Sequence, residues 1–446
     1  MSSVETSKET RNMLLNVGPS HPAMHGVIRL ITELEGEKVI KVEAEIGYLH
    51  RAFEKSAENS SWTQVIPYTD RLNYVSPLIN NFGYCGAVEK LLVIETTERC
   101  KFIRVVMSEV SRITDHLTCI AASAMELGAI TAFLYFMKAR EYLYEIVEEV
   151  TGARLTISYG RIGGVKADLP EGVADRLEAA LRKTERELSE VDKLLTRNRI
   201  FVDRTRDVGV LTQEDAIGYG ITGPILRSTG VNYDVRKSFP YDVYARMDFE
   251  VPLGERGDNY DRYLVRMEEM RQSIRIIRQA LREMPGGPVN VDADGKVMTS
   301  FDLVDQAKLG HTAGLVNVVS TVEPTLEGTE RPYHDRVMPD NKGVVLPSKG
   351  DTYGNIEGLM NHFKLIMDYH GIRPLAGDTY HAVEGANGEL GFYVVSDAKD
   401  RPYRVRVRPP CFFAMAGLHR MLEGYMVADI IPTFGSINMI AGELDR

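Results

Sequence analysis

The chain has 446 residues, of which 44% are hydrophobic and 26% charged, values typical of a soluble globular protein. Its formal net charge of −10 argues against nucleic-acid binding, because a phosphate backbone attracts a basic surface. The longest apolar run, Leu127–Met137, is far shorter than a membrane span, and the N-terminus has neither signal-peptide nor transit-peptide character. We therefore expect a protein on the cytoplasmic side that touches a membrane only through partners.

The middle of the chain is predicted to be helical, with short β elements before and after it. Alternating residues predict a β-hairpin over Val27–Leu34 and Val39–Ala44. Apolar residues three and four apart predict helices over Val75–Leu92, Cys100–Leu127, Phe133–Val150, Pro170–Leu195, a short segment opened by Thr212, and Asp258–Glu283. The C-terminal part predicts helices over Ile356–Tyr369 and Leu418–Ile431, and strands within His381–Val395 and Tyr403–Val407.

The predicted fold class is mainly α with small β regions near both ends (α+β). We divide the chain into a β-rich region with a site-forming loop (1–66), a helical body (67–285), an irregular region that contacts partners (286–352) and a C-terminal region of helix, small β region and site-lining tail (353–446). The third part is assigned on its content of Gly, Pro, Asp and Thr.

A Pro/Gly-rich segment near the start of the chain, Gly18–Gly26, contains two histidines, His21 and His25. Pro19 and Pro22 lack backbone donors and fix φ near −65°, so the segment cannot form a regular helix. We predict a stiff loop that orients two imidazoles. A turn with two surface histidines and no function is the alternative.

Two further side chains could take part in chemistry. Tyr74 follows a loop, and its hydroxyl is a poor base but a useful proton donor, since a phenol has a pKa near 10. Glu126 has apolar and small neighbours late in a helix, so we expect it to be buried and to need a partner such as a histidine. The alternatives are an ordinary core tyrosine and a solvent-facing glutamate.

Other motifs indicate no metal or nucleotide site. Residues Gly160–Val165 fit neither a phosphate loop nor a dinucleotide fingerprint, and neither HExxH nor GxSxG occurs. His21 and His25 have no clear third ligand, which disfavours zinc. The four cysteines are not spaced as CxxC and are best explained as core residues in a reduced compartment; they are Cys85, Cys100, Cys119 and Cys411.

Several sequence motifs, taken in order, resemble the 49 kDa (D-type) subunit family of respiratory complex I, the proton-pumping NADH:quinone oxidoreductase. The resemblance covers Asn12–Arg446 and rests on GPSHPAMHGVIRL, GYLHRAFEK, PYTDRLNYVSP, AVEKLL, FIRVVMSEVSRITDHL, AMELGA, RIGGVKADLP and the tail GELDR. That family is similar in fold to the large subunit of nickel–iron hydrogenases, which implies a hydrogenase-like helical body. The chain lacks the CxxC pairs that hold the hydrogenase metal, so the resemblance implies a former metal cavity that now serves quinone.

The resemblance implies specific roles for several residues. His25 and Tyr74 match the family's quinone head-group ligands, and Glu126 stands where most members carry the Asp that pairs with the histidine. His21 is then a secondary member of the loop. Asn73 replaces a more usual Asp, which removes one nearby charge.

Three cations match positions near the terminal iron–sulfur cluster of a neighbouring subunit. They are Arg51, Arg71 and Lys166, the last standing where many ubiquinone-using members have a histidine. A lysine keeps its charge across physiological pH whereas a histidine titrates. We hypothesise that the cluster potential depends less on pH here, as would suit menaquinone.

By resemblance, the chain is a quinone-site subunit, inactive alone, of an H⁺-translocating NADH:quinone oxidoreductase, a translocase. It would bind no cofactor itself, use quinone (menaquinone or ubiquinone) as substrate and lie beside a 4Fe-4S cluster held by a partner. The implied partners are the small iron–sulfur subunit (B type), the 30 kDa subunit (C type), the ferredoxin-like subunit (I type) and membrane subunits of H and A type. The implied location is peripheral, on the cytoplasmic side of the bacterial inner membrane. Alternatives are a related complex fed by ferredoxin or F420H2, and a redox-inactive hydrogenase-like scaffold.

Overall fold

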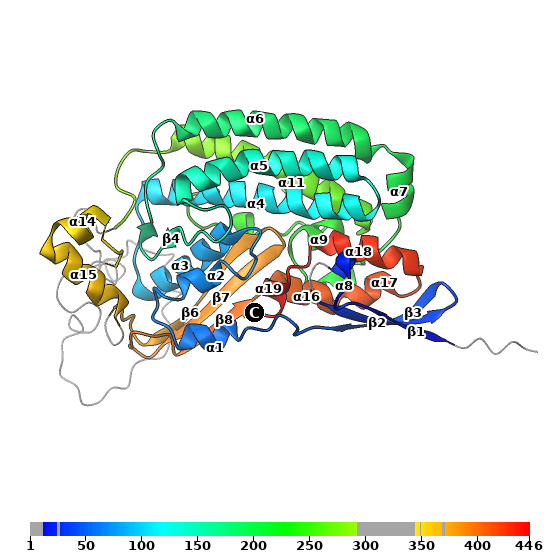
Figure 1. Ribbon diagram of the computed structural model, residues 1–446, viewed down its shortest axis with the longest axis horizontal. Helices are drawn as coiled ribbons and strands as arrows, with labels where there is room; N and C mark the ends of the chain where they lie inside the picture. The colour runs from blue at the N-terminus through cyan, green and yellow to red at the C-terminus, as the bar shows by residue number, and fades with distance from the viewer. Residues whose placement is uncertain (1–11, 25–26, 292–343, 348, 368–370) are drawn as a thin grey trace, which may run out of the picture.

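The computed structural model describes residues 12–24, 27–291, 344–347, 349–367 and 371–446 (Figure 1). Long helices form one layer, which lies over a second layer of shorter helices and sheets (Figure 1). The long helices are α4 (Glu98–Glu126), α5 (Ile130–Thr151), α6 (Val173–Val191) and α11 (Asn259–Glu283). The shorter α3 (Pro77–Leu92) packs beneath α4. The helices predicted over Cys100–Leu127, Phe133–Val150, Pro170–Leu195 and Asp258–Glu283 therefore exist close to the predicted positions.

The ends of these helices follow from individual side chains. The Thr97 hydroxyl accepts the backbone N–H of Cys100 at 3.3 Å and begins α4. The Asp258 carboxylate accepts the N–H of Asp261 at 2.7 Å and begins α11. Gly152, with φ of 89°, ends α5 in the left-handed conformation, as its sequence position predicts.

Two three-stranded antiparallel sheets lie near the two ends of the chain. The first has the order β1 (Met13–Val17), β2 (Arg29–Glu35) and β3 (Lys38–Glu45), so the predicted hairpin is confirmed and one more strand precedes it. The second has the order β6 (Gly377–Gly385), β7 (Gly388–Ser396) and β8 (Arg404–Arg408), and α3 packs on β6 and β7. These sheets confirm the α+β class.

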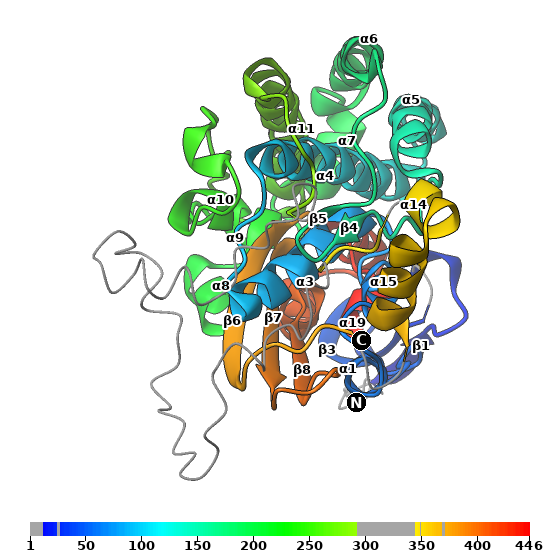
Figure 2. The same cartoon turned by 90° about the vertical axis from the view of Figure 1, so that its left-hand side faces the viewer.

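The remaining α-helices and strands are short, and most lie below or beside the layer of long helices (Figures 1 and 2). They are α1 (Phe53–Glu58), α2 (Ile66–Thr69), β4 (Gly160–Arg161), β5 (Gly164–Val165), α7 (Arg199–Thr205), α8 (Gln213–Gly218), α9 (Gly223–Ser228), α10 (Val235–Ser238), α14 (Lys349–Gly354), α15 (Ile356–Ile366), α16 (Pro410–Ala416), α17 (Leu418–Leu422), α18 (Ile430–Ile437) and α19 (Ala441–Leu444). Figure 1 shows α14 and α15 at the opposite end of the molecule from the N-terminal sheet. Most of the predicted irregular region, 292–343, lies outside the described residues.

The prediction of a single helix over Leu418–Ile431 is wrong, because α17 ends at Leu422 and α18 begins only at Ile430. The N–H of Gly424 donates to the carbonyl of Val39 at 2.8 Å, and the N–H of Val39 donates to Tyr425 at 2.8 Å. The backbone thus leaves the helix to pair with the edge of β3. Gly424, with φ of 91°, permits the break.

The N-terminal sheet and the C-terminal helices share one hydrophobic core. It includes Met24, Leu30, Phe434 and Leu444, with Tyr74 packed against its border. The first and last parts of the chain therefore meet, which brings the sequence-predicted loop, the tyrosine and the C-terminal tail together. Within the described ranges, no helix has the length and apolar character needed to cross a bilayer.

Candidate functional site

The C-terminal tail, residues 441–446, runs directly against two of the predicted loops. A Cβ added to Gly442 would lie 2.5 Å from the carbonyl oxygen of Arg71, so only glycine fits at this contact. The Arg51 guanidinium donates to the carbonyls of Arg71 at 2.7 Å and of Gly442 at 3.1 Å. Three segments far apart in sequence are thereby fixed to one another.

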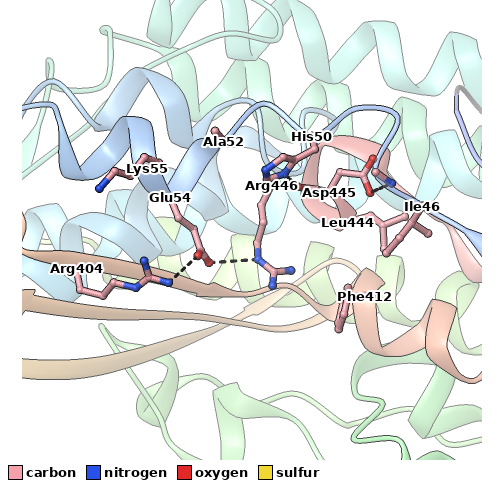
Figure 3. A pocket seen from close by; sticks show the side chains of 11 residues that line it. Ile46, His50, Ala52, Glu54, Lys55, Arg404, Phe412, Leu444, Asp445 and Arg446 are labelled. Atoms are coloured by element: carbon pink, nitrogen blue, oxygen red, sulfur yellow. Dashed lines mark hydrogen bonds and ion pairs between the residues drawn. The ribbon is translucent and has the colours of Figure 1, made fainter.

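Asp445 and Arg446, the last two residues of the tail, make further contacts and border a pocket of about 390 Å³ (Figure 3). The Asp445 carboxylate accepts the N–H groups of Gly47 at 2.9 Å and Leu49 at 2.8 Å. Figure 3 shows Glu54 between Arg404 and Arg446, and the Arg446 Nε lies 3.2 Å from its carboxylate. The pocket is lined by Ile46, Gly47, His50, Ala52, Glu54, Lys55, Arg404, Phe412, Leu444, Asp445 and Arg446.

Tyr74 lies half-buried where the tail and α3 meet, three residues before α3 begins. The helix starts later than predicted because Pro77 takes its first position, where a missing N–H costs nothing. Burial raises the pKa of Tyr74, and the nearby Arg51 only partly opposes this. The hydroxyl therefore stays protonated and can act as a hydrogen-bond donor.

Asp70 lies buried beneath this loop. Its carboxylate accepts the side-chain amide of Asn81 at 2.7 Å and both the N–H and the hydroxyl of Ser158, at 2.9 and 2.7 Å. Burial raises the pKa of Asp70, while these donors lower it. Asp70 thus ties the Tyr74 loop to α3 and to the segment before β4.

The described part of the histidine loop forms a tight turn. His21 is exposed, its carbonyl accepts the N–H of Met24 at 3.0 Å, and its Nδ1 accepts the N–H of Ala23 at 3.2 Å. This short turn, Pro22–Met24, packs against α18. His25 lies outside the described residues.

Glu126 ends α4 and is half-buried, not fully buried as expected, because it stands at the helix terminus. Its Oε2 atom is nevertheless buried. A Cβ added to Gly435 on α18 would lie 2.4 Å from this oxygen. The Glu126 carboxylate therefore lies against α18, the helix on which the Pro22–Met24 turn also packs.

The three predicted cations divide between two places. Arg51 and Arg71 are exposed and adjacent, and partial burial together with the Arg71 charge lowers the pKa of Arg51. Lys166 is also exposed, and its Nζ donates to the carbonyl of Thr151 at 3.2 Å, at the end of α5. Its backbone N–H donates to Tyr159, one residue after Ser158.

A buried polar cluster lies behind Tyr74, and the sequence pattern does not predict it. Asp115 accepts hydrogen bonds from Asn73, Ser76 and Asn438 at 2.7–2.8 Å. Asn438 also donates to Asn387 at 2.6 Å. The one available signal is Asp115 itself, an acidic residue within a largely apolar helical stretch. Among the described residues, no group of three or more His, Cys, Asp or Glu is placed to hold a metal ion.

Comparison with known proteins gives consistent matches. A family model described as "Respiratory-chain NADH dehydrogenase, 49 Kd subunit" matches residues 126–446. The D-type subunit of the NADH-quinone oxidoreductase of Myxococcus xanthus is 49% identical, with 100% of this chain and 95% of that protein aligned. Its counterpart in Pelobacter propionicus is 47% identical, with 100% of this chain and 98% of that protein aligned. A C/D-type subunit of the same enzyme in Bdellovibrio bacteriovorus is 46% identical over 97% of this chain and 68% of that protein.

Proposed function

Since the chain belongs to the 49 kDa (D-type) subunit family of respiratory-chain NADH dehydrogenases, we propose that it forms one wall of the site where quinone is reduced. The observation that carries this proposal is the placing of Tyr74, half-buried and protonated, between the C-terminal tail and the Asp115 cluster. Reduction puts negative charge on the quinone oxygens. A donor already aimed at that charge stabilises it at little cost in reorganisation.

In this proposal two donors hold the quinone head group from opposite sides. Tyr74 donates to one carbonyl oxygen, and His25 donates to the other and supplies a proton near neutral pH. Glu126 pairs with His25, which is consistent with the packing of both Glu126 and the Pro22–Met24 turn against α18. His21 is a secondary member of the loop, with its ring held in the turn.

Electrons would arrive from a 4Fe-4S cluster in the small iron–sulfur subunit. Arg51 and Arg71 are adjacent and exposed at the edge of the Tyr74 loop, so their charge could favour the reduced cluster. The 30 kDa subunit is a further proposed partner, supported by the C/D-type relative. The ferredoxin-like subunit and membrane subunits of H and A type complete the proposal, with the chain on the cytoplasmic face of the bacterial inner membrane.

Lys166 leads to a prediction about the cluster potential. We expect the midpoint potential in the assembled complex to change little between pH 6 and 8, because position 166 carries no histidine that could take up a proton when the cluster is reduced. The Lys166→His variant should acquire a slope that approaches about 59 mV per pH unit for a one-electron couple. Redox titration monitored by electron paramagnetic resonance measures both. A full slope around neutrality in the unmodified complex would contradict the role given to Lys166.

A structure of the assembled complex with quinone or a head-group inhibitor bound tests the site directly. The head group should lie within about 3 Å of the Tyr74 hydroxyl, the ordinary distance of an O–H···O hydrogen bond. A head group bound away from Tyr74 and His25 would refute the assignment. The same density would show whether Glu126 contacts His25.

A further inference from the structure

Glu443, in the C-terminal tail, is a buried carboxyl to which the proposed mechanism gives no role. It lies in α19 and is 1% exposed. Its Oε1 accepts the backbone N–H of Cys411 at 3.1 Å, and the Cys411 thiol and Asn387 add side-chain hydrogen bonds. A buried carboxylate whose donors include a weak thiol and a long backbone N–H is poorly stabilised as an anion.

A chain of amides joins Glu443 to a second buried carboxyl, Asp115. The Asn387 amide donates to the Cys411 thiol at 3.4 Å, and the Asn438 amide donates to Asn387 at 2.6 Å and to Asp115 at 2.7 Å. Asp115 has two further donors, Asn73 and Ser76, at 2.8 and 2.7 Å. Each carboxyl has three donors, but those of Asp115 are two amides and a hydroxyl at 2.7–2.8 Å, whereas Glu443 has a thiol and a backbone N–H at 3.1 Å among its three. Because a thiol is a weak donor, the Glu443 carboxylate is the less stabilised of the two.

The titratable and charged groups around Glu443 come from several elements. Asp115 on α4 and Cys411 on α16 face it from within, and Tyr74 before α3 lies near both of them. Arg51 before α1 bonds the carbonyl of the preceding Gly442, while Asp445 and Arg446 point to the loop at 47–50 and to Glu54. The described neighbours thus place no cation in direct contact with the Glu443 carboxyl.

Burial, with the charge of Asp115, raises the pKa of Glu443 to about 7. Near neutral pH the group is therefore divided between acid and carboxylate. Any new negative charge nearby shifts this balance toward the acid, because like charges disfavour ionisation.

We propose that Glu443 binds a proton from solvent when negative charge develops at Tyr74 during quinone reduction. This inference rests on the proposed function. The quinone receives its two electrons from the partner's cluster, and Glu443 forms an O–H bond without touching the quinone. Glu443 acts through Tyr74 as a positioning residue. When Glu443 is neutral, only the negative charge of Asp115 lies behind the tyrosine, whereas an ionised Glu443 would add a second negative charge.

The first test is the pH profile of NADH:quinone reductase activity in the assembled complex. The rate should fall about tenfold between pH 7 and 8.5 as Glu443 ionises, and Glu443→Gln, which is always neutral, should lose most of that fall. Glu443→Asp should keep it. Glu423→Gln, a half-exposed carboxyl nearby in sequence, is the matched control and should follow the unmodified profile.

A second measurement separates Glu443 from other groups that titrate near neutrality, such as His25. Redox-induced infrared difference spectra at pH 8 should show the carbonyl stretch of a newly protonated carboxylic acid on quinone reduction. The band should be absent in Glu443→Gln and retained in Glu423→Gln. The reduction of an artificial acceptor by NADH, upstream of the quinone site, should be unchanged in every variant, which shows that electron input to the purified complex is intact.

The proposal is overturned if Glu443→Gln keeps the alkaline fall in rate and the infrared band while the artificial acceptor is reduced normally. It is also overturned if Glu443→Gln and Glu443→Asp lower activity equally at every pH, the result of a purely structural role. Failure of the proposed function looks different, because quinone would then be reduced normally in a Tyr74→Phe variant.

Discussion

Replacing Tyr74 with phenylalanine will lower the quinone reductase rate of the assembled complex about 100-fold. The change removes one oxygen atom from a half-buried position and leaves the packing intact. The lost hydroxyl is a donor to the charge that develops on the quinone, and a single such donor contributes on the order of 10²–10³ in rate. NADH:quinone reductase activity, divided by NADH oxidation with an artificial acceptor, measures the effect.

Tyr68→Phe is the matched control for this prediction. Tyr68 lies on α2, six residues before Tyr74, and is 44% exposed. Loss of its hydroxyl should leave the normalised rate within about twofold, since surface substitutions have small effects. A redox-inactive scaffold predicts that both variants, and also His25→Ala, behave like the unmodified chain, and that changes at Arg71 affect assembly alone.

Sequence periodicity predicts the helical body well because long amphipathic helices carry a repeated signal. The helix expected over Cys100–Leu127 is α4, Glu98–Glu126, and the pattern repeated along its 29 residues outweighs any single exception. The prediction fails where backbone pairing overrides propensity. Residues around Tyr425 pair with β3, a partner nearly the whole chain away, and no local pattern reveals that contact.

The same distinction applies to the candidate site. Tyr74 and Arg71 could be proposed from the sequence because they lie in one short motif, and their roles stay predictions. The link from Glu443 to Asp115 joins the last turn of the chain to the middle of α4, and it depends on amides that look like ordinary polar residues in the sequence. Burial determines the chemistry of these groups. Whether a single polar side chain is buried depends on the tertiary structure, which the local sequence pattern does not show.

Replacing Arg227 with methionine will destabilise the subunit by about 3–5 kcal/mol, the cost of leaving buried carboxylates without their cation. Arg227, on α9, is fully buried and lies 2.6 Å from Glu269 on α11 and 2.8 Å from Glu384 on β6. Glu269 also contacts His116 on α4 at 2.7 Å. Burial alone would raise the pKa of Glu269, but Arg227 and His116 hold it below its usual range. One guanidinium therefore joins the helical layer to the C-terminal sheet.

The expected result is a lower unfolding temperature of the subunit within the purified complex, or a failure to recover assembled complex. Arg182→Met is the matched control: its guanidinium pairs with Glu178 on the surface of α6, and its loss should change stability by less than about 1 kcal/mol. Adding Glu269→Gln to Arg227→Met should cost less than the sum of the single changes, because the second substitution neutralises the charge that the first leaves unpaired. Equal effects of Arg227→Met and Arg182→Met would show that the buried cluster does not hold the two layers together.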